Sequence, residues 1–234
     1  MKQGGAALLP PLLLSSAYVA FTGRADGDMG HGGDSVVAVR PDVAARRRAV
    51  VDLPWTWLRQ VHGAGVVRVA GPGEGAGAPA DAVVTAEAGC AVAVLTADCP
   101  PVALASAEGV IGVAHAGWRG VVAGVLEATV AEMRSMGASH IEAVIGPCIR
   151  PGCYAFGSGQ LDEVAARLGD GVRATTTAGE PALDIPAAVR IALARAGVDP
   201  GAVADVGTCT ACSSRHYSWR ARGEQERQAA VIWR

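Results

Sequence analysis

A layered α/β or α+β fold in a single domain is predicted for this 234-residue chain. Short apolar runs, each suited to a buried strand, alternate with segments whose apolar residues recur at helical spacing. Half of the residues are hydrophobic, which is enough to build a sizeable core. No internal repeat or long linker divides the chain, so we expect residues 1–234 to form a single domain, with a flexible or atypical segment at residues 1–17.

The predicted strands are apolar runs bounded by turn residues. Residues 91–96 form one strand, and residues 102–105 are expected to continue it beyond Pro100 and Pro101. Another apolar run spans residues 61–69. Further strands are expected at residues 110–114, 141–145, 203–206 and 229–233.

Three helices are predicted from apolar spacing and end signals. The first begins at Trp118 and runs to a stop at Gly137. The second covers residues 161–168. The third follows a capping Asp184, carries Pro186 in its first turn and ends at Gly197. Glycine-rich loops are expected at residues 23–33 and 71–79.

The charge and composition exclude several classes of function. The formal net charge is -2 and aromatic residues make up 4%, so neither a basic surface nor a stacking platform for nucleic acid is expected. No apolar run reaches the length of a membrane span. The six cysteines lack the dense spacing of a small disulfide scaffold, which favours reduced thiols in the cytoplasm.

Export is the competing interpretation of the N-terminal segment. Lys2 precedes an apolar stretch at residues 6–16, and residues 17–20 form a crude cleavage site. However, Pro10 and Pro11 interrupt the stretch and only one positive charge precedes it. We therefore predict a cytoplasmic protein.

Three short motifs carry ligand types that zinc prefers. They are Gln60-Val61-His62-Gly63, Thr96-Ala97-Asp98-Cys99-Pro100, and Ala114-His115-Ala116-Gly117-Trp118-Arg119-Gly120. Two imidazoles and one thiol leave an open position on a tetrahedral ion, as catalytic zinc sites do. Cys99 and His115 follow predicted strands, where rigid scaffolds present chemistry. The N-terminus of the following helix, at residues 117–120, would favour an anion near the metal.

Each of these residues also has an ordinary interpretation. A lone histidine is usually a surface or core residue with its hydrogen bonds satisfied, and a lone cysteine usually packs as a small buried hydrophobe. The charges of Asp98 and Arg119 beside apolar strands would be costly unless they are paired or used. Other zinc signatures fail, because no His-x-Glu with Pro-Cys-x-x-Cys is present. The Cys209-x-x-Cys212 pair lacks a second pair, and we interpret it as structural or incidental.

Together the three motifs resemble a family known as zinc-dependent purine nucleoside phosphorylase, polyphenol oxidase "laccase domain" protein, or peptidoglycan editing factor. Secondary matches occur at residues 81–85, 145–149, 153–154, 209–210 and 216–220. The resemblance implies a four-layer α-β-β-α fold with mixed sheets and zinc bound by His62, Cys99 and His115. It also implies phosphorolysis of adenosine, inosine and methylthioadenosine, with adenosine deamination as a second activity.

The resemblance departs from the family pattern near the N-terminus. Residues 22–28 differ in spacing from the family's Thr-Arg-x-Gly-Gly-x-Ser loop, although Arg24 could fill its arginine position. Trp219 stands where the family usually has tyrosine. The first departure affects the expected substrate or phosphate pocket most.

Roles for the remaining site residues follow from their chemistry. For deamination, Asp98 either moves the proton or only orients a ligand, and both interpretations remain open. For phosphorolysis, arginine suits phosphate because it binds bidentately. Arg119 is the first candidate and Arg24 and Arg220 are the next, although surface ion pairs are the common fate of arginine. Gln60 is included with the substrate- and phosphate-binding residues.

Three other classes of function remain as alternatives. A copper laccase is disfavoured, because five histidines are too few for a blue copper and a trinuclear cluster. A cysteine hydrolase would use Cys99 as nucleophile and His115 as base to edit peptidoglycan precursors. A metal-free binding protein is the non-enzymatic alternative. We expect small-molecule nucleosides and phosphate as partners; the sequence does not determine the oligomeric state.

Overall fold

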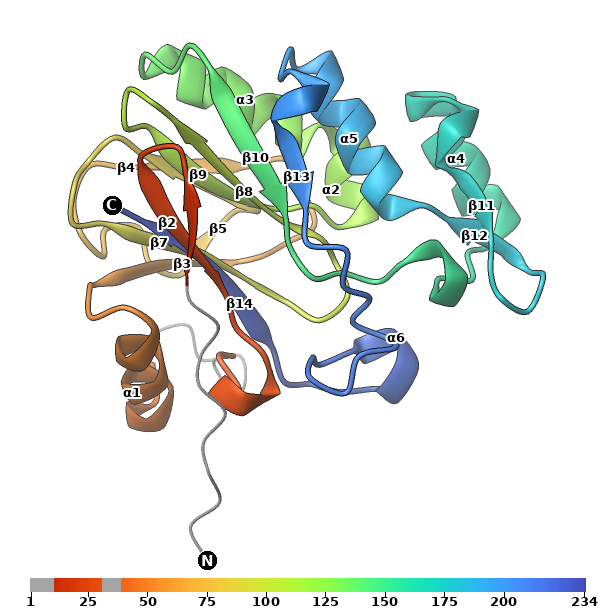
Figure 1. Ribbon diagram of the computed structural model, residues 1–234, viewed down its shortest axis with the longest axis horizontal. Helices are drawn as coiled ribbons and strands as arrows, with labels where there is room; N and C mark the ends of the chain where they lie inside the picture. The colour runs from red at the N-terminus through yellow and green to blue at the C-terminus, as the bar shows by residue number, and fades with distance from the viewer. Residues whose placement is uncertain (1–10, 31–38) are drawn as a thin grey trace, which may run out of the picture.

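Two six-stranded mixed sheets pack face to face in the structure, a computed structural model that describes residues 11–30 and 39–234 (Figure 1). The first sheet has the strand order β1 (Leu12–Leu14), β2 (Ala17–Phe21), β14 (Gln228–Trp233), β7 (Ala91–Thr96), β3 (Trp55–Arg59), β5 (Ala78–Pro79). The second has the order β13 (Val203–Asp205), β10 (Ile141–Ile145), β8 (Pro101–Ser106), β9 (Ile111–His115), β6 (Ala82–Thr85), β4 (Val66–Val69). Strands β11 (Arg173–Thr175) and β12 (Pro181–Leu183) form a separate hairpin.

Helices cover the outer face of each sheet. The helix α1 (Pro41–Val50) lies by the first sheet, and a short α6 (Trp219–Arg222) precedes β14. The second sheet is covered by α2 (Trp118–Ala123), α3 (Val125–Ser135) and α5 (Ile185–Arg195), and α4 (Ser158–Leu168) packs beyond them against α2, α5 and β12. Single 3-10 turns are η1 (Arg24–Asp26), η2 (Pro151–Cys153), η3 (Asp170–Val172) and η4 (Pro200–Ala202). This arrangement confirms the predicted α/β fold with α-β-β-α layers.

The central strands read as continuous apolar runs because both of their faces are buried. In β8, Val102 and Leu104 face the core under the helices, whereas Ala103 and Ala105 face the core between the sheets. In β7, Val92 and Val94 enter the core between the sheets, while alternate residues face the outer core. The rigid double sheet therefore fixes the positions of the strand ends.

The prediction that residues 102–105 continue the strand at 91–96 is wrong. Strand β7 belongs to the first sheet and β8 to the second. Asp98 lies between them at a positive φ of 95°, a conformation that reverses the chain. The connection thus carries the chain, and Cys99 with it, from one sheet to the other.

The prediction of one continuous helix after Trp118 is wrong, because the structure has two helices there. The helical segment is divided into α2 and α3 at Gly124, whose φ of 92° ends the first helix. The apolar run at residues 61–69 contributes only β4, because residues 61–65 form the connection from β3. By contrast, Asp184 caps α5 by accepting a hydrogen bond from the Ala187 N–H at 2.9 Å, as predicted.

The N-terminal segment is only partly described. Residues 12–14 and 17–21 form an antiparallel hairpin on β14, so residues 12–17 are ordinary sheet structure. Residues 1–10, and residues 31–33 of the predicted loop at 23–33, lie outside the described residues. Within the described ranges, no helix is both long and apolar enough to cross a membrane.

Candidate metal centre

Three connections meet at one end of the double sheet. His62 follows β3 and Cys99 follows β7, and both connections pass from the first sheet to the second. His115 is the last residue of β9, where it pairs in register with Pro101 at the start of β8. Because β3 and β7 are neighbours and β8 and β9 are neighbours, the sheet topology brings the three side chains together.

The ligand atoms of His62, Cys99 and His115 all lie within 4.8 Å of one another. The two imidazole rings meet edge to face, with centroids 4.8 Å apart. His62 is exposed, Cys99 half-buried and His115 buried. Spacing of this kind suits a single ion bound by two nitrogens and one sulfur, with a side open towards solvent at His62.

Asp81, the residue before β6, supports both histidines from a fully buried position. Its carboxylate contacts His115 Nδ1 at 2.9 Å and accepts the backbone N–H groups of His62 at 2.9 Å and Gly63 at 2.7 Å. A proton on Nδ1 of His115 leaves Nε2 for the ion, the arrangement that orients metal-bound histidines in proteins. No role was predicted for Asp81, although it lies in the secondary match at residues 81–85; the available signal was a carboxylate at the start of a buried strand.

Cys99 and His115 perturb one another electrostatically. Burial tends to raise the pKa of Cys99, but His115 and His62 outweigh it and lower that pKa to about 6. Burial tends to lower the pKa of His115, but Cys99 and Asp81 raise it to about 9. Without a metal, the pair is therefore a thiolate beside an imidazolium at neutral pH.

Gly117, at the start of α2, lies against all three ligands. A Cβ atom there would lie 3.0 Å from His62 Cδ2, 3.2 Å from Cys99 Sγ and 3.4 Å from His115 Cε1. The backbone of His62 is itself held at a positive φ of 59°. Such conformations cluster at functional sites, where the surrounding structure enforces them. The helix α2 has only six residues, so its dipole adds less than the predicted long helix would.

Both carboxylate oxygens of Asp98 are already engaged in hydrogen bonds. One carboxylate oxygen accepts the Thr210 hydroxyl at 2.7 Å, and the other accepts the Arg220 N–H at 2.7 Å. The side chain is buried. Both oxygens thus join the loop that carries Cys99 to the C-terminal segment, which favours the orienting role.

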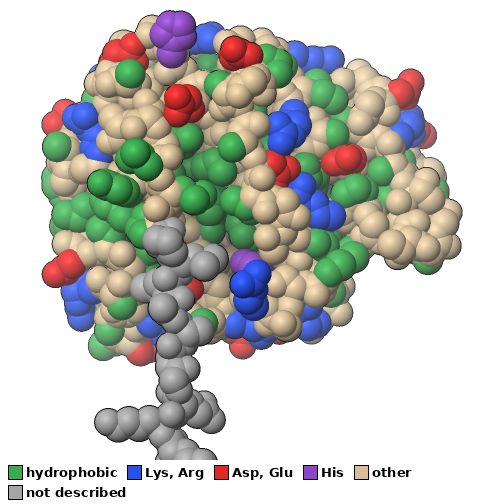
Figure 2. All heavy atoms as spheres, in the orientation of Figure 1, with side chains coloured by type: hydrophobic (Ala, Val, Ile, Leu, Met, Phe, Trp, Pro, Cys, Tyr) green, Lys and Arg blue, Asp and Glu red, His purple; other side chains and the backbone are tan. Residues whose placement is uncertain are grey.

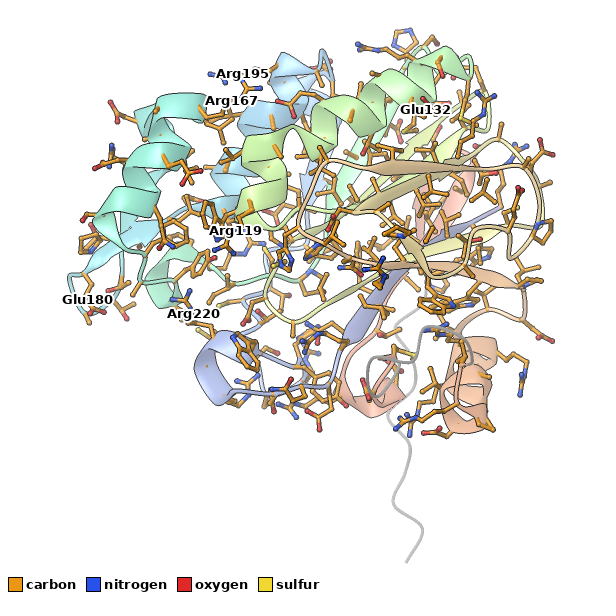
Figure 3. The ribbon with its side chains drawn as sticks, turned by 180° about the vertical axis from the view of Figure 1, so that it is seen from behind. Arg119, Glu132, Arg167, Glu180, Arg195 and Arg220 are labelled. Carbon is orange, nitrogen blue, oxygen red and sulfur yellow. The ribbon has the colours of Figure 1, made fainter. Side chains whose placement is uncertain are left out.

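Arg119 and Arg220 lie on the same side of the molecule (Figure 3). The positive charge of each opposes the rise in the pKa of Tyr154 that burial causes. The Arg220 guanidinium stacks over the Tyr154 ring at 4.9 Å and donates to the Ala155 carbonyl at 2.7 Å. Arg119 stacks over Trp118 at 4.6 Å. Burial raises the pKa of Tyr154, and the negative charge at Cys99 adds to this effect. Two arginines and Tyr154 therefore border the region of Cys99. Tyr154 lies in the secondary match at residues 153–154, and no role was predicted for it.

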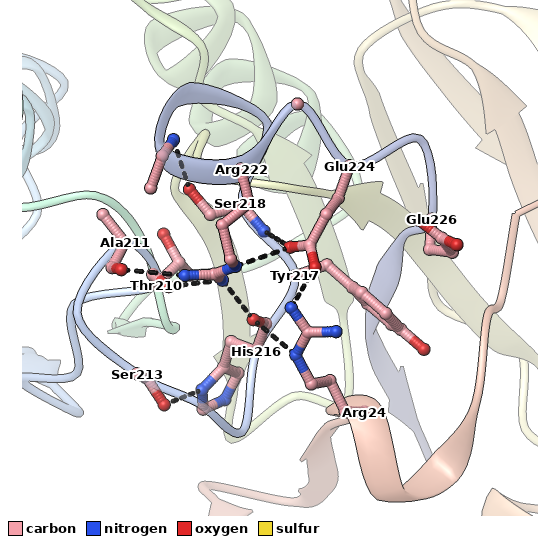
Figure 4. A network of polar contacts seen from close by, with 12 residues as sticks. Arg24, Thr210, Ala211, Ser213, His216, Tyr217, Ser218, Arg222, Glu224 and Glu226 are labelled. Carbon is pink, nitrogen blue, oxygen red and sulfur yellow. Dashed lines mark hydrogen bonds and ion pairs between the residues drawn. The ribbon is translucent and has the colours of Figure 1, made fainter.

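Arg24 and Gln60 make structural contacts instead. Arg24 pairs with Glu224 and donates to the His216 carbonyl at 3.2 Å (Figure 4). Gln60 extends the sheet, because its side-chain amide donates to the Leu95 carbonyl at 2.7 Å and accepts the Leu95 N–H at 2.8 Å. Their predicted contacts with substrate or phosphate stay predictions.

A family described as "Multi-copper polyphenol oxidoreductase laccase" matches residues 27–234. The chain belongs to this family. Within it, purine nucleoside phosphorylase ORF3 of Streptomyces griseus is 39% identical over 235 residues, covering 93% of this chain and 94% of that protein. Purine nucleoside phosphorylase SCO2081 of Streptomyces coelicolor is 42% identical, covering 88% of this chain and 86% of that protein.

Solved structures of the laccase-like family share the fold. The crystal structure of YlmD from Geobacillus stearothermophilus matches with a TM-score of 0.81 and 30% identity, covering 94% of this chain and 93% of that one. YfiH from Bacillus licheniformis matches with a TM-score of 0.82 and 25% identity, covering 96% and 97%. These likenesses confirm the family suggested by the three motifs.

Proposed function

We propose that this chain is a zinc-dependent purine nucleoside phosphorylase that cleaves adenosine, inosine and methylthioadenosine, with adenosine deamination as a side activity. The convergence of His62, Cys99 and His115 carries the proposal. The names of the relatives supply the class of substrate, purine nucleosides and phosphate. We further propose that the protein acts in the cytoplasm as a single domain.

The residues present fit a zinc ion better than a copper cluster. One thiolate and two imidazoles match the ligands that zinc takes, and Gly117 leaves the space that a side chain would occupy. Among the described residues, this is the one candidate group that contains histidine. A multicopper oxidase needs more imidazoles than five histidines provide. When bound, zinc supplies a Lewis acid that polarises an oxygen at the open position.

The protein's own side chains would perform the remaining steps. Asp81 holds the ligands in orientation, since it fixes His115 through Nδ1 and His62 through the backbone. Arg119 and Arg220 would bind phosphate and align it for attack on the ribose, because guanidinium groups grip phosphate oxygens in pairs. Asp98 would keep the Cys99 loop in place.

The test combines metal content with nucleoside turnover. Zinc-loaded protein should convert adenosine to adenine and ribose 1-phosphate only when phosphate is present, whereas deamination should give inosine without phosphate. A Cys99→Ala variant should lose one zinc and both activities, while the Cys90→Ala variant, which removes a thiol just before the opposite end of β7, should keep them. Full zinc content in Cys99→Ala, or no turnover of any nucleoside, would contradict the proposal.

One observation favours a second candidate, a cysteine hydrolase acting on peptidoglycan precursors. Cys99, His115 and Asp81 follow one another as nucleophile, base and orienting group do: His115 has taken the thiol proton, which it can then donate to the leaving group, and Asp81 orients its ring. The two candidates respond oppositely to metal. A hydrolase of this type should cleave its substrate when stripped of zinc and be inhibited by added zinc, whereas the phosphorylase should need zinc.

A further inference from the structure

A second group of possible metal ligands lies outside the site described above. The thiol sulfurs of Cys153, Cys209 and Cys212 all lie within 4.8 Å of one another. Cys153 ends η2, while the other two lie in the segment between β13 and α6. The fold therefore adds a third thiol to the Cys209-x-x-Cys212 pair, from a residue more than fifty positions earlier in the chain.

We propose that Cys153, Cys209 and Cys212 bind one zinc ion that joins η2 to the segment before α6. Three thiolates are soft ligands, which select zinc over hard cations such as magnesium or calcium. Because Cys212 is exposed, the fourth position of the ion opens to solvent. The proposal does not depend on the activity of the protein.

The backbone around Cys209 is arranged to stabilise a thiolate. Burial tends to raise the pKa of Cys209, but the nearby backbone N–H groups of Cys212, Arg150 and Ala211 outweigh it and lower that pKa. The Ser213 N–H also bonds the Cys209 carbonyl at 3.0 Å, which closes the turn.

Neighbouring contacts hold the three sulfurs in place. Arg222 donates to the Ala211 carbonyl at 2.9 Å and to the Thr210 carbonyl at 3.2 Å, which fixes the turn from the side of α6 (Figure 4). The Cys153 and Cys212 sulfurs are 2.9 Å apart. Thiolates on tetrahedral zinc lie about 3.8 Å apart, given Zn–S bonds of about 2.3 Å. A small rotation of the exposed Cys212 side chain meets that spacing.

The three-cysteine group is connected to the loop that carries Cys99 through Thr210. Thr210, between two of the proposed ligands, donates the hydrogen bond that holds Asp98, and Asp98 precedes Cys99. Zinc at the three-cysteine site would therefore stiffen a segment that contacts the loop of the histidine-containing site. Binding would release the protons of the thiols that are not yet ionised.

The first experiment counts zinc in full-length, reduced protein after washing with a weak chelator. We expect two zinc ions in the native protein and in the Cys90→Ala control, and one in each of the Cys153→Ser, Cys212→Ser and His62→Ala variants. The Cys212→Ser/His62→Ala double variant should hold none. If the native protein and Cys212→Ser bind the same number of zinc ions, the proposal is wrong.

Cobalt substitution distinguishes the two sites by their ligands. Cobalt in His62→Ala protein should show charge-transfer absorption from three thiolates, and cobalt in Cys212→Ser protein should show that from one. Zinc should raise the Tm of His62→Ala but not that of the double variant, since only a folded site gains from binding. A Cys153–Cys212 disulfide in reducing, zinc-containing buffer, or uptake of Cu(I) without zinc, would overturn the proposal. These outcomes leave the phosphorylase proposal separately testable, because Cys99 belongs to the other site.

Discussion

Asp81 organises the candidate metal centre from a position that solvent does not reach. Its two oxygens serve a side chain from β9 and the backbone of the β3–β4 connection, so one carboxylate positions two ligands. We expect Asp81→Asn to weaken zinc binding about 10- to 100-fold, the usual cost of losing an orienting partner. Competition with a chromophoric chelator measures this affinity.

The control for Asp81→Asn is Asp199→Asn. Asp199 is exposed, accepts a hydrogen bond from the Gly201 N–H at 2.9 Å, and is not itself a proposed ligand. Its replacement should leave zinc affinity unchanged. Equal affinities in the two variants would show that Asp81 does not orient the ligands.

Gly117 is required for its lack of a side chain. Its φ of -60° suits alanine, so a Gly117→Ala substitution acts through the new Cβ, 3.0 Å from His62 and 3.2 Å from Cys99. We expect zinc affinity to fall about tenfold as the ligands are displaced. Isothermal titration with zinc checks this, and Gly71→Ala is the matched control because no atom lies within 4 Å of its added Cβ.

Zinc binding should release protons from the thiolate–imidazolium pair. Between pH about 6 and about 9, Cys99 has already lost its proton and His115 still carries two. Zinc displaces the Nε2 proton, so we expect about one proton per ion and an affinity that rises about tenfold per pH unit in this window. Calorimetry in two buffers of different ionisation enthalpy measures it, in Cys212→Ser protein to remove the three-cysteine group. A pH-independent affinity would contradict the assignment of His115.

At the scale of elements, the C-terminal segment acts as a brace for the β7–β8 connection. Two residues of the segment between β13 and β14 donate hydrogen bonds to the Asp98 carboxylate: the Thr210 hydroxyl and the Arg220 backbone N–H. Arg24 and Arg222 both pair with Glu224, which ties η1 to the region of α6 (Figure 4). The brace explains why residues distant in sequence are needed to fix the loop that carries Cys99.

The brace can be tested at Thr210, which is fully buried. Thr210→Val leaves a buried carboxylate oxygen of Asp98 without its partner, and we expect a loss of about 1–3 kcal/mol in the free energy of unfolding. Thr210→Ser keeps the hydroxyl and should cost less. Urea denaturation measures both, and a larger loss in Thr210→Ser than in Thr210→Val would mean that the packing of the methyl group, not the hydrogen bond, is what matters.

The whole molecule derives its rigidity from two sheets packed face to face between helical layers. Charged residues of both signs are interspersed over the surface, and the face in Figure 2 shows no continuous basic patch. The ligand-bearing connections lie at one end of this rigid body, which limits how far they can move apart.

Acid should destabilise the metal-free molecule through its buried carboxylates. Burial raises the pKa of Asp81, but its hydrogen bonds to His115 and Gly63 outweigh this, so the pKa lies below the usual value. A depressed pKa contributes stability above the unfolded value, about 4, and this stability is lost as pH falls through the native pKa. Asp81→Asn should therefore flatten the decline of the urea midpoint below pH about 4, whereas Asp199→Asn should follow the native curve.

The layered fold, about half of the described strands and the three ligand candidates could be predicted from the amino-acid sequence. Strands such as residues 91–96 are buried on both faces, so their apolar runs are unmistakable, and Asp184 and Gly197 bound α5 through local chemistry. The three motifs were distinctive because polar ligands follow apolar strands. What local pattern could not give was the chain reversal at Asp98 or the division of one helix at Gly124, since both depend on single backbone dihedral angles.

Only the tertiary structure decided which residues meet. Asp81 serves the histidines, Asp98 serves the C-terminal brace, and Cys153 joins Cys209 and Cys212, each across 19 residues of sequence or more. It also showed Arg24 and Gln60 in structural contacts. The physical reason is that hydrogen bonds and metal geometry depend on distances of a few ångströms between side chains, and those distances are set by how the two sheets pack rather than by spacing along the chain.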